Sequence, residues 1–216
     1  MLGTIDAGDM GITLTHEHLL CDTSYRFVEP KIDSQKELAN ARIKIENLDW
    51  IKRNQNSCLD NLSLLNEESA ISELYHYKKK GGGTVVDVGN IGLSRNPEGL
   101  ARISRATGIN IIMGAGYYVG TSHPPELASK TEDQITDEIV RDITIGVGDT
   151  GIKAGILGEI GCSYPLKDTE VKVLGAVARA QKITGISVNI HPGQSQTSPI
   201  EIIEFLSDNG GDINRT

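Results

Sequence analysis

Two histidines stand two residues apart near the amino terminus. His16 and His18 lie in the segment Gly11-Ile-Thr-Leu-Thr-His-Glu-His-Leu-Leu20, which is typical of a short strand. Side chains at positions i and i+2 lie on one face of a strand, so both imidazoles point the same way, as two ligands of one metal ion require. Ile12 and Leu14 share that face and are expected to fill the layers beneath. The alternative is a pair of histidines in a solvated turn.

Two further strand ends carry residue types that bind metal ions. Glu159 follows a strand predicted over 152–158, where a carboxylate is costly to bury unless it is paired or bound to a metal. His191 follows a strand predicted over 186–190. A solvated carboxylate and a histidine that caps a Pro-Gly turn are the alternatives. The carboxyl ends of parallel strands converge on one face of an α/β protein, so we expect these groups to meet.

The combination of these residues indicates hydrolase chemistry. A carboxylate has two oxygens, so Glu159 can bridge two metal ions, one bound by His16 and His18 and the other by His191. Two metal ions about 3.5–4 Å apart would activate a bridging hydroxide and polarise a scissile carbonyl or phosphoryl bond. No thiolate stands beside these residues, which favours hard or borderline divalent metal ions.

Two weaker candidates for substrate binding follow other predicted strands. Tyr117 and Tyr118 come after the third strand, and one of them should face the site; packing against neighbouring loops is the alternative. Arg95 follows the second strand and could hold an anionic substrate group, although its residue type is also common in solvated loops. Cys162 has no evident base partner, so we interpret it as a packing residue.

The composition excludes several classes of protein. The 216 residues carry a net charge of −8, which argues against a nucleic-acid or anionic-membrane surface. No apolar run approaches the ~20 residues of a membrane span, and the amino terminus does not resemble a signal peptide. The three cysteines form no disulfide or metal-binding pattern, which favours a cytoplasmic protein. A small-molecule substrate is the expected partner, and formation of a homo-oligomer is left open.

From residue 66 the chain alternates strands and helices, which predicts a parallel sheet. The expected strands are 11–20, 84–89, 109–114, 152–158 and 186–190, and the expected helices are 67–79, 97–106, 131 onward, 168–183 and 198–207. Such a sheet can either stay open, as in a doubly wound fold, or close into an eight-stranded barrel. We expect one α/β domain over 1–216, an incomplete (β/α)8 barrel with about five β/α units. Residues 21–65 are expected to form a long loop with a helix over 34–47, placed as part of a substrate lid.

The motifs resemble the phosphotriesterase-related proteins of the amidohydrolase superfamily, along nearly the whole chain. The matching segments are Thr13-Leu-Thr-His-Glu-His-Leu19, Gly81-Gly-Gly83, Gly114-Ala-Gly116 with Tyr118-Val119, Gly158-Glu-Ile-Gly-Cys-Ser163, Pro165-Leu166 and Ile190-His-Pro-Gly193. The resemblance implies a (β/α)8 barrel of the metal-dependent hydrolase type. It also implies two divalent metal ions, expected to be zinc, bound by His16, His18, Glu159 and His191.

The implied reaction is hydrolysis of the amide bond of a small N-acylated substrate such as N-acetyltaurine. Glu159 stands where members that hydrolyse organophosphates use a carbamylated lysine, which lowers the expectation of phosphotriesterase activity. The family supplies a further histidine and the proton-accepting aspartate from the sixth and eighth strands, so these are expected beyond residue 216. A truncated, non-catalytic form and a lactonase or phosphotriesterase are the alternatives.

Overall fold

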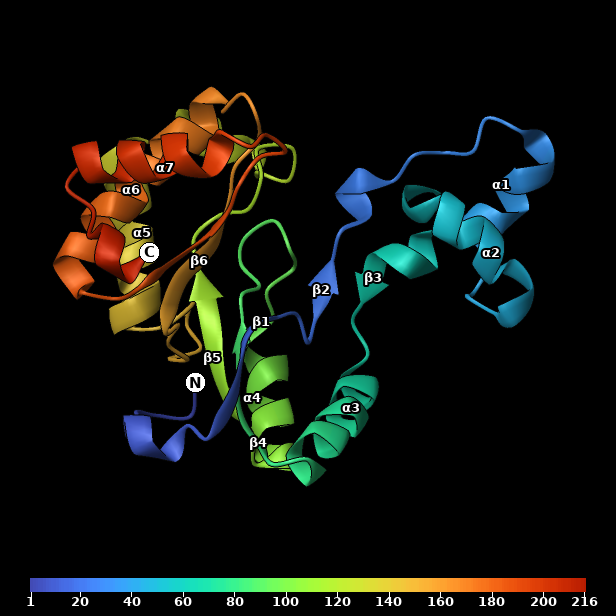
Figure 1. The fold of residues 1–216 in the computed structure, drawn as a ribbon, viewed down its shortest axis with the longest axis horizontal. Helices are drawn as coiled ribbons and strands as arrows, with labels where there is room; N and C mark the ends of the chain where they lie inside the picture. The colour runs from blue at the N-terminus through green and yellow to red at the C-terminus, as the bar shows by residue number, and fades with distance from the viewer.

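The computed structural model describes residues 1–216 and contains a parallel five-stranded sheet (Figure 1). Its strand order is β1-β4-β5-β6-β7, so each strand lies beside the next one along the chain. The strands are β1 (Ile12–Glu17), β4 (Gly82–Asp87), β5 (Asn110–Ala115), β6 (Ile156–Gly161) and β7 (Val188–His191). The predicted α/β class with successive β/α units is confirmed.

Helices connect these strands. They are α3 (Glu67–Lys79), α4 (Pro97–Thr107), α5 (Glu132–Thr144), α6 (Asp168–Thr184) and α7 (Ser198–Asp208). Local sequence explains several of their ends. The Thr131 hydroxyl accepts from the Gln134 amide and the Gln134 side chain accepts from the Thr131 amide, which forms a capping box at the start of α5. Gly108 ends α4 with a φ of 67°, a left-handed conformation that favours glycine.

The core lies between the sheet and the helices that cover it. Strand residues such as Val85, Met113 and Leu157 are fully buried, and Leu174 and Val177 of α6 are buried with them. Helices α5 and α6 pack against each other beside the sheet (Figure 1). This packing fixes the strands rigidly, so the side chains at their carboxyl ends hold defined positions.

The segment between β1 and α3 forms an arm beside the sheet (Figure 1). A two-stranded ribbon closes its base, in which β2 (Cys21–Asp22) pairs antiparallel with β3 (Ser63–Leu64). The arm carries α1 (Asp33–Ala39) and α2 (Ile45–Arg53). The ribbon fixes the start of the arm, so the short 3-10 helix η2 (Ser24–Arg26) lies next to the sheet's carboxyl edge.

Several predictions were wrong in the bounds of their elements. The strand expected over 11–20 ends at Glu17, so His18 directly follows β1. The single helix over 34–47 is replaced by α1 and α2, because the Asn47 side chain starts α2 by accepting from the Lys44 amide and donating to the Arg42 carbonyl. Strand β6 runs from Ile156 to Gly161 rather than over 152–158. Glu159 therefore lies within the strand, which places its side chain more deeply than an end position would.

The first strand is an edge strand, and this exposes side chains that were expected to be covered. Ile12 is 61% exposed and Leu14 is 41% exposed, because β1 pairs only with β4 and no other element covers this face. The expectation that these two residues fill buried layers beneath the histidines was therefore wrong for this chain. No helix combines the length and the apolar character needed to cross a membrane.

Candidate metal centre

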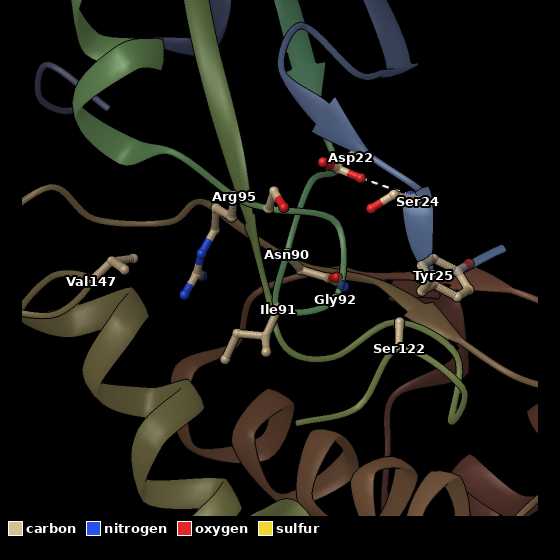
Figure 2. Close-up of a pocket in the computed structure, with 10 residues that line it drawn as sticks. Asp22, Ser24, Tyr25, Asn90, Ile91, Gly92, Arg95, Ser122 and Val147 are labelled. Atoms are coloured by element: carbon tan, nitrogen blue, oxygen red, sulfur yellow. Dashed lines mark hydrogen bonds between the residues drawn. The ribbon is translucent and has the colours of Figure 1, made fainter. Parts of the chain in front are cut away.

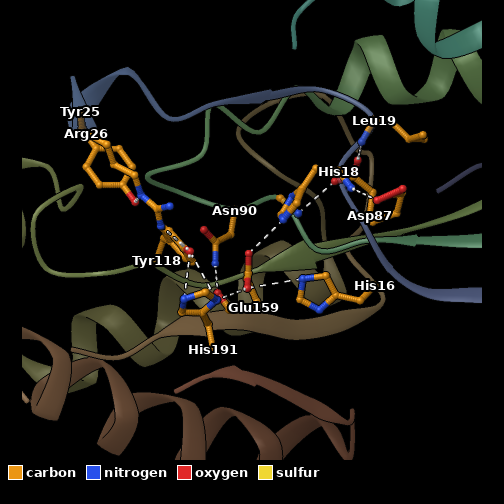
Figure 3. Close-up of polar contacts among 12 residues, drawn as sticks. His16, His18, Leu19, Tyr25, Arg26, Asp87, Asn90, Tyr118, Glu159 and His191 are labelled. Carbon is orange, nitrogen blue, oxygen red and sulfur yellow. Dashed lines mark hydrogen bonds and ion pairs between the residues drawn. The ribbon is translucent and has the colours of Figure 1, made fainter. Parts of the chain in front are cut away.

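Glu159 lies at the centre of a cluster of three histidines (Figure 3). Its Oε1 is 3.1 Å from Nε2 of His18, while Oε2 is 3.6 Å from Nε2 of His16 and 3.0 Å from Nδ1 of His191. The carboxylate is 2% exposed, whereas the three imidazoles are partly open to solvent. Residues from β1, β6 and β7 thus meet at one point, as the strand-end argument predicts.

The cluster controls the protonation of its carboxylate. Burial by itself raises the pKa of Glu159, but hydrogen bonds and charges from His18 and His191 outweigh burial and lower the pKa to about 2. Burial lowers the pKa of His18, and the hydrogen bond and charge of Glu159 reverse this and raise it. Glu159 is therefore ionised at neutral pH and has only nitrogen donors around it.

This donor set fits a divalent metal ion. Atoms of His16, His18 and Glu159 that can bind metal all lie within 4.8 Å of one another. Imidazole nitrogen and carboxylate oxygen are the ligands that zinc and similar ions prefer. Nε2 of His18 faces Glu159, and the other ring nitrogen, Nδ1, is buried without a hydrogen-bond partner. His191 lies outside this group of three but contacts the second oxygen of Glu159.

Buried polar residues hold the chain around the candidate metal ligands. The Asp87 carboxylate at the end of β4 accepts hydrogen bonds from the Leu19 amide at 2.7 Å and from the Gly89 amide at 3.0 Å. Asp87 thereby ties the residue that follows His18 to the neighbouring strand. The side-chain amide of the buried Asn90 donates to the Glu159 carbonyl. These contacts fix the backbone on both sides of the cluster.

The two tyrosines after β5 have different positions. Tyr118 is buried, and its hydroxyl lies 3.3 Å from Nε2 of His191 and accepts a hydrogen bond from Nη2 of Arg26 at 3.0 Å. Tyr117 points away, because its hydroxyl donates to Glu138 on α5. The structure therefore brings Tyr118 to the cluster, and packs Tyr117 against a helix. His123 contacts the Tyr118 carbonyl at 2.7 Å and so supports the same loop.

A cleft of about 510 Å³ opens beside His191. Its wall includes η2, the loop after β5, the loop after β6 and the turn after β7. The lining residues are Tyr25, Arg26, Asn56, Val119, Thr121, Cys162, Ser163, Tyr164, His191, Pro192, Gly193 and Gln194. His191 is the member of the cluster that lines this cleft, so a small molecule bound there would lie beside it. Cys162 is 2% exposed, and burial raises the pKa of its thiol to about 12, which supports its interpretation as a packing residue.

Arg95 is not part of the cluster. Its Nη2 donates to the Asp142 carboxylate at 2.7 Å and its Nη1 donates to the Gly114 carbonyl at 3.0 Å. It lines a separate cavity of about 440 Å³, where it lies near Val147 and away from Asp22, Ser24 and Tyr25 (Figure 2). Because the guanidinium is engaged by Asp142, its visible role is to join the loop after β4 to α5.

Three residues that sequence reasoning did not single out complete this region. Asn90 follows β4 as a polar residue after an apolar strand, so the same strand-end rule could have found it. Asp87 is a carboxylate inside a buried strand, which is a similar signal. Arg26 lies in a polar loop segment and carried no signal of its own beyond the expectation that this loop covers the site.

Comparison with known proteins decides the family. The profile described as phosphotriesterase family matches residues 1–216. The chain belongs to the phosphotriesterase family. Among curated relatives, it is 42% identical over 233 residues to N-acetyltaurine hydrolase of Dictyostelium discoideum, with 99% of this chain and 63% of the relative covered. It is 43% identical over 217 residues to N-acetyltaurine hydrolase of Bos taurus, with 100% of this chain and 62% of the relative covered.

A solved structure shares the fold. The resiniferatoxin-binding protein from Rhodobacter sphaeroides superposes with a TM-score of 0.92 at 34% sequence identity, and the match covers 96% of this chain and 58% of that one. This phosphotriesterase-family chain therefore spans somewhat less than two thirds of the length of the curated relatives and about three fifths of that structure. The likeness confirms the predicted barrel-type α/β fold for the residues present.

Proposed function

We propose that this protein is a metal-dependent hydrolase that cleaves the amide bond of a small N-acylated substrate such as N-acetyltaurine. The observation that carries the proposal is the buried carboxylate of Glu159 with nitrogen atoms of three histidines within 3.6 Å. The names of the relatives from Dictyostelium discoideum and Bos taurus support the choice of substrate.

Two divalent ions, expected to be zinc, fit the arrangement. His16 and His18 would hold one ion, His191 would hold the other, and the two oxygens of Glu159 would reach both. Histidine nitrogens on both oxygens of Glu159 support the assignment, with His18 facing Oε1, and His191 and His16 facing Oε2 at 3.0 Å and 3.6 Å. Divalent ions held there supply Lewis acidity to the scissile carbonyl and to the attacking water.

The residues of the chain itself provide a binding cleft and orient the candidate ligands. The cleft beside His191 admits a small acylated molecule, and the Tyr118 hydroxyl lies next to the metal ligand at its inner end. Burial, followed by the charge of Glu159, raises the pKa of Tyr118 above that of a free phenol. The hydroxyl therefore stays protonated at neutral pH and can donate a hydrogen bond. Its position beside His191 suits it to orient the imidazole.

A substrate panel on the zinc-loaded full-length protein tests the proposal. N-acetyltaurine should be hydrolysed to taurine and acetate, while a lactone and a phosphotriester should be turned over far more slowly. The Glu159→Gln variant should lose the activity, and Glu201→Gln on the exposed face of α7 should retain it. Faster turnover of the lactone or the phosphotriester would show that the protein is a lactonase or a phosphotriesterase rather than an amidohydrolase. No turnover of any of the three would overturn the proposed function.

A further inference from the structure

Arg26 is a cation without a carboxylate partner at the rim of the candidate site. Six of the nine arginines form ion pairs within 4 Å, namely Arg53, Arg95, Arg102, Arg141, Arg179 and Arg215. Arg26 instead makes hydrogen bonds only to tyrosine hydroxyls, from Nε to Tyr25 at 2.8 Å and from Nη2 to Tyr118 at 3.0 Å. In a protein with a net charge of −8, an oriented and unneutralised cation in a cleft is a distinctive feature.

The rings of the same two tyrosines also contact the guanidinium of Arg26. Its central carbon lies 5.5 Å from the centre of the Tyr25 ring and 5.8 Å from that of the Tyr118 ring. Such cation–π contacts orient an arginine without neutralising its charge. Nη1 makes no hydrogen bond, so donors of the guanidinium fork remain available to a ligand. The side chain is therefore positioned before any ligand arrives.

Arg26 and His191 line the same cleft of about 510 Å³. A single hydroxyl joins them, because the Tyr118 oxygen is 3.0 Å from Nη2 of Arg26 and 3.3 Å from Nε2 of His191 (Figure 3). The guanidinium thus lies one side chain away from the metal ligands. A short molecule whose amide carbonyl is at the cluster would extend its other end toward Arg26.

We propose that Arg26 is the substrate-positioning residue that binds an oxyanion at the end of the substrate opposite the scissile amide. The inference rests on the proposed hydrolase function and deepens it by naming the residue that binds the anionic end, which in N-acetyltaurine is a sulfonate two carbons from the nitrogen. A guanidinium fork matches both groups with paired, charge-assisted hydrogen bonds. A neutral N-acyl compound of the same length forms no charge-assisted hydrogen bond with Arg26.

Three substrates of matched length distinguish a loss of anion binding in an Arg26 variant from a general loss of catalysis or folding. These are N-acetyltaurine with a sulfonate, N-acetyl-β-alanine with a carboxylate, and N-acetylethanolamine with a neutral hydroxyl. Arg26→Gln should lower kcat/KM for the two anions by about 10- to 100-fold, through KM, as expected for the loss of charge-assisted hydrogen bonds. Turnover of the neutral compound should change by less than about twofold. Arg26→Lys should recover part of the loss, because it restores the charge without the fork.

The matched control is Arg105→Gln, because Arg105 is exposed on α4, has no ion pair and lies outside the cleft. It should leave all three substrates unchanged. An equal loss on the anionic and neutral substrates, or no loss on the anions, would overturn the role of Arg26 and leave the hydrolase function standing. In the wild type, the ratio of kcat/KM between the two anions shows which group the cleft prefers.

Binding measured without turnover separates this inference from the proposed function. Taurine and β-alanine should bind the wild type in calorimetric titrations, and Arg26→Gln should weaken binding by about 10-fold or more. If the wild type hydrolyses none of the substrates yet binds these anions through Arg26, the hydrolase function fails and the oxyanion site stands. If Arg26→Gln binds them as tightly as the wild type, the oxyanion site is overturned.

Discussion

Oε2 of Glu159 lies 3.0 Å from Nδ1 of His191, while its other oxygen faces His18 on the opposite side. One buried carboxylate thereby joins a ligand on β7 to the histidine pair on β1. If each side holds its own ion, His191→Ala should reduce bound zinc from two equivalents toward one, because only the ion beside β7 loses its imidazole. Elemental analysis after dialysis measures this, with His76→Ala on the exposed face of α3 as the control. Unchanged zinc content in His191→Ala would remove His191 from the ligand set.

The Tyr118 hydroxyl contacts both Arg26 and His191, so Tyr118→Phe tests the link between the cleft and the metal ligands. The variant should raise KM for N-acetyltaurine by about 2- to 10-fold, since one hydrogen bond that orients each partner is lost. Zinc content should stay the same. Tyr75→Phe is a matched control, because that hydroxyl bonds the Ala106 carbonyl away from the site. Identical kinetics in both variants would assign Tyr118 to packing alone.

The meeting of the candidate ligands could be predicted from sequence because it depends on strand geometry. His16 lies in β1, His18 directly follows it, and the ends of successive parallel strands adjoin, so Glu159 and His191 were expected to meet them. Helix bounds such as those of α4 followed from local signals, namely Pro97 at the start and Gly108 at the end.

Roles that depend on distant partners could not be predicted in this way. Arg26 is defined by Tyr118, which is 92 positions further along the chain, and nothing near Arg26 indicates that contact. Arg95 was expected to bind substrate because it follows a strand, but Asp142 on α5, 47 positions away, engages its guanidinium. Residue type and local position are the same for a free and a paired arginine, so only the tertiary structure distinguishes them.

The Arg95–Asp142 ion pair should contribute to stability rather than to catalysis. The two side chains are 6% and 14% exposed, so Arg95→Met would leave a buried carboxylate without its partner. The expected loss is about 3–5 kcal/mol in the free energy of unfolding, measured by urea denaturation. The exposed pair of Arg53 and Asp49 on α2 is the control, and Arg53→Met should cost less than about 1 kcal/mol. Wild-type stability together with a raised KM in Arg95→Met would restore the substrate-binding role.

Glu170 should make stability depend on acid pH. It accepts hydrogen bonds from the amides of Gly120, Ser163 and Lys167, so it holds together two loops at the cleft. Burial raises the pKa of Glu170, but these hydrogen bonds outweigh burial and lower the pKa below its ordinary value of 4.5. The stabilisation is therefore fully present above pH 4.5 and is lost as the pH falls through the lowered pKa.

The test compares Glu170→Gln with the wild type in urea at several pH values. At pH 7 the variant should be less stable by about 1–3 kcal/mol, and the difference should shrink as the pH falls below 4.5. Glu201→Gln, which alters an exposed carboxylate on α7, should show no such pH-dependent difference. A difference for Glu170→Gln that is constant with pH would contradict the assigned hydrogen-bonded carboxylate.

The metal content of the zinc-loaded full-length protein, compared with that of its Glu159→Gln variant, tests the central claim most directly. The wild type should retain two zinc ions per chain after dialysis, and the variant should lose both, because it removes the carboxylate whose oxygens reach both sides of the cluster. Retention of both ions by Glu159→Gln, or of none by the wild type, would show that the cluster of His16, His18, Glu159 and His191 is not a binuclear metal centre.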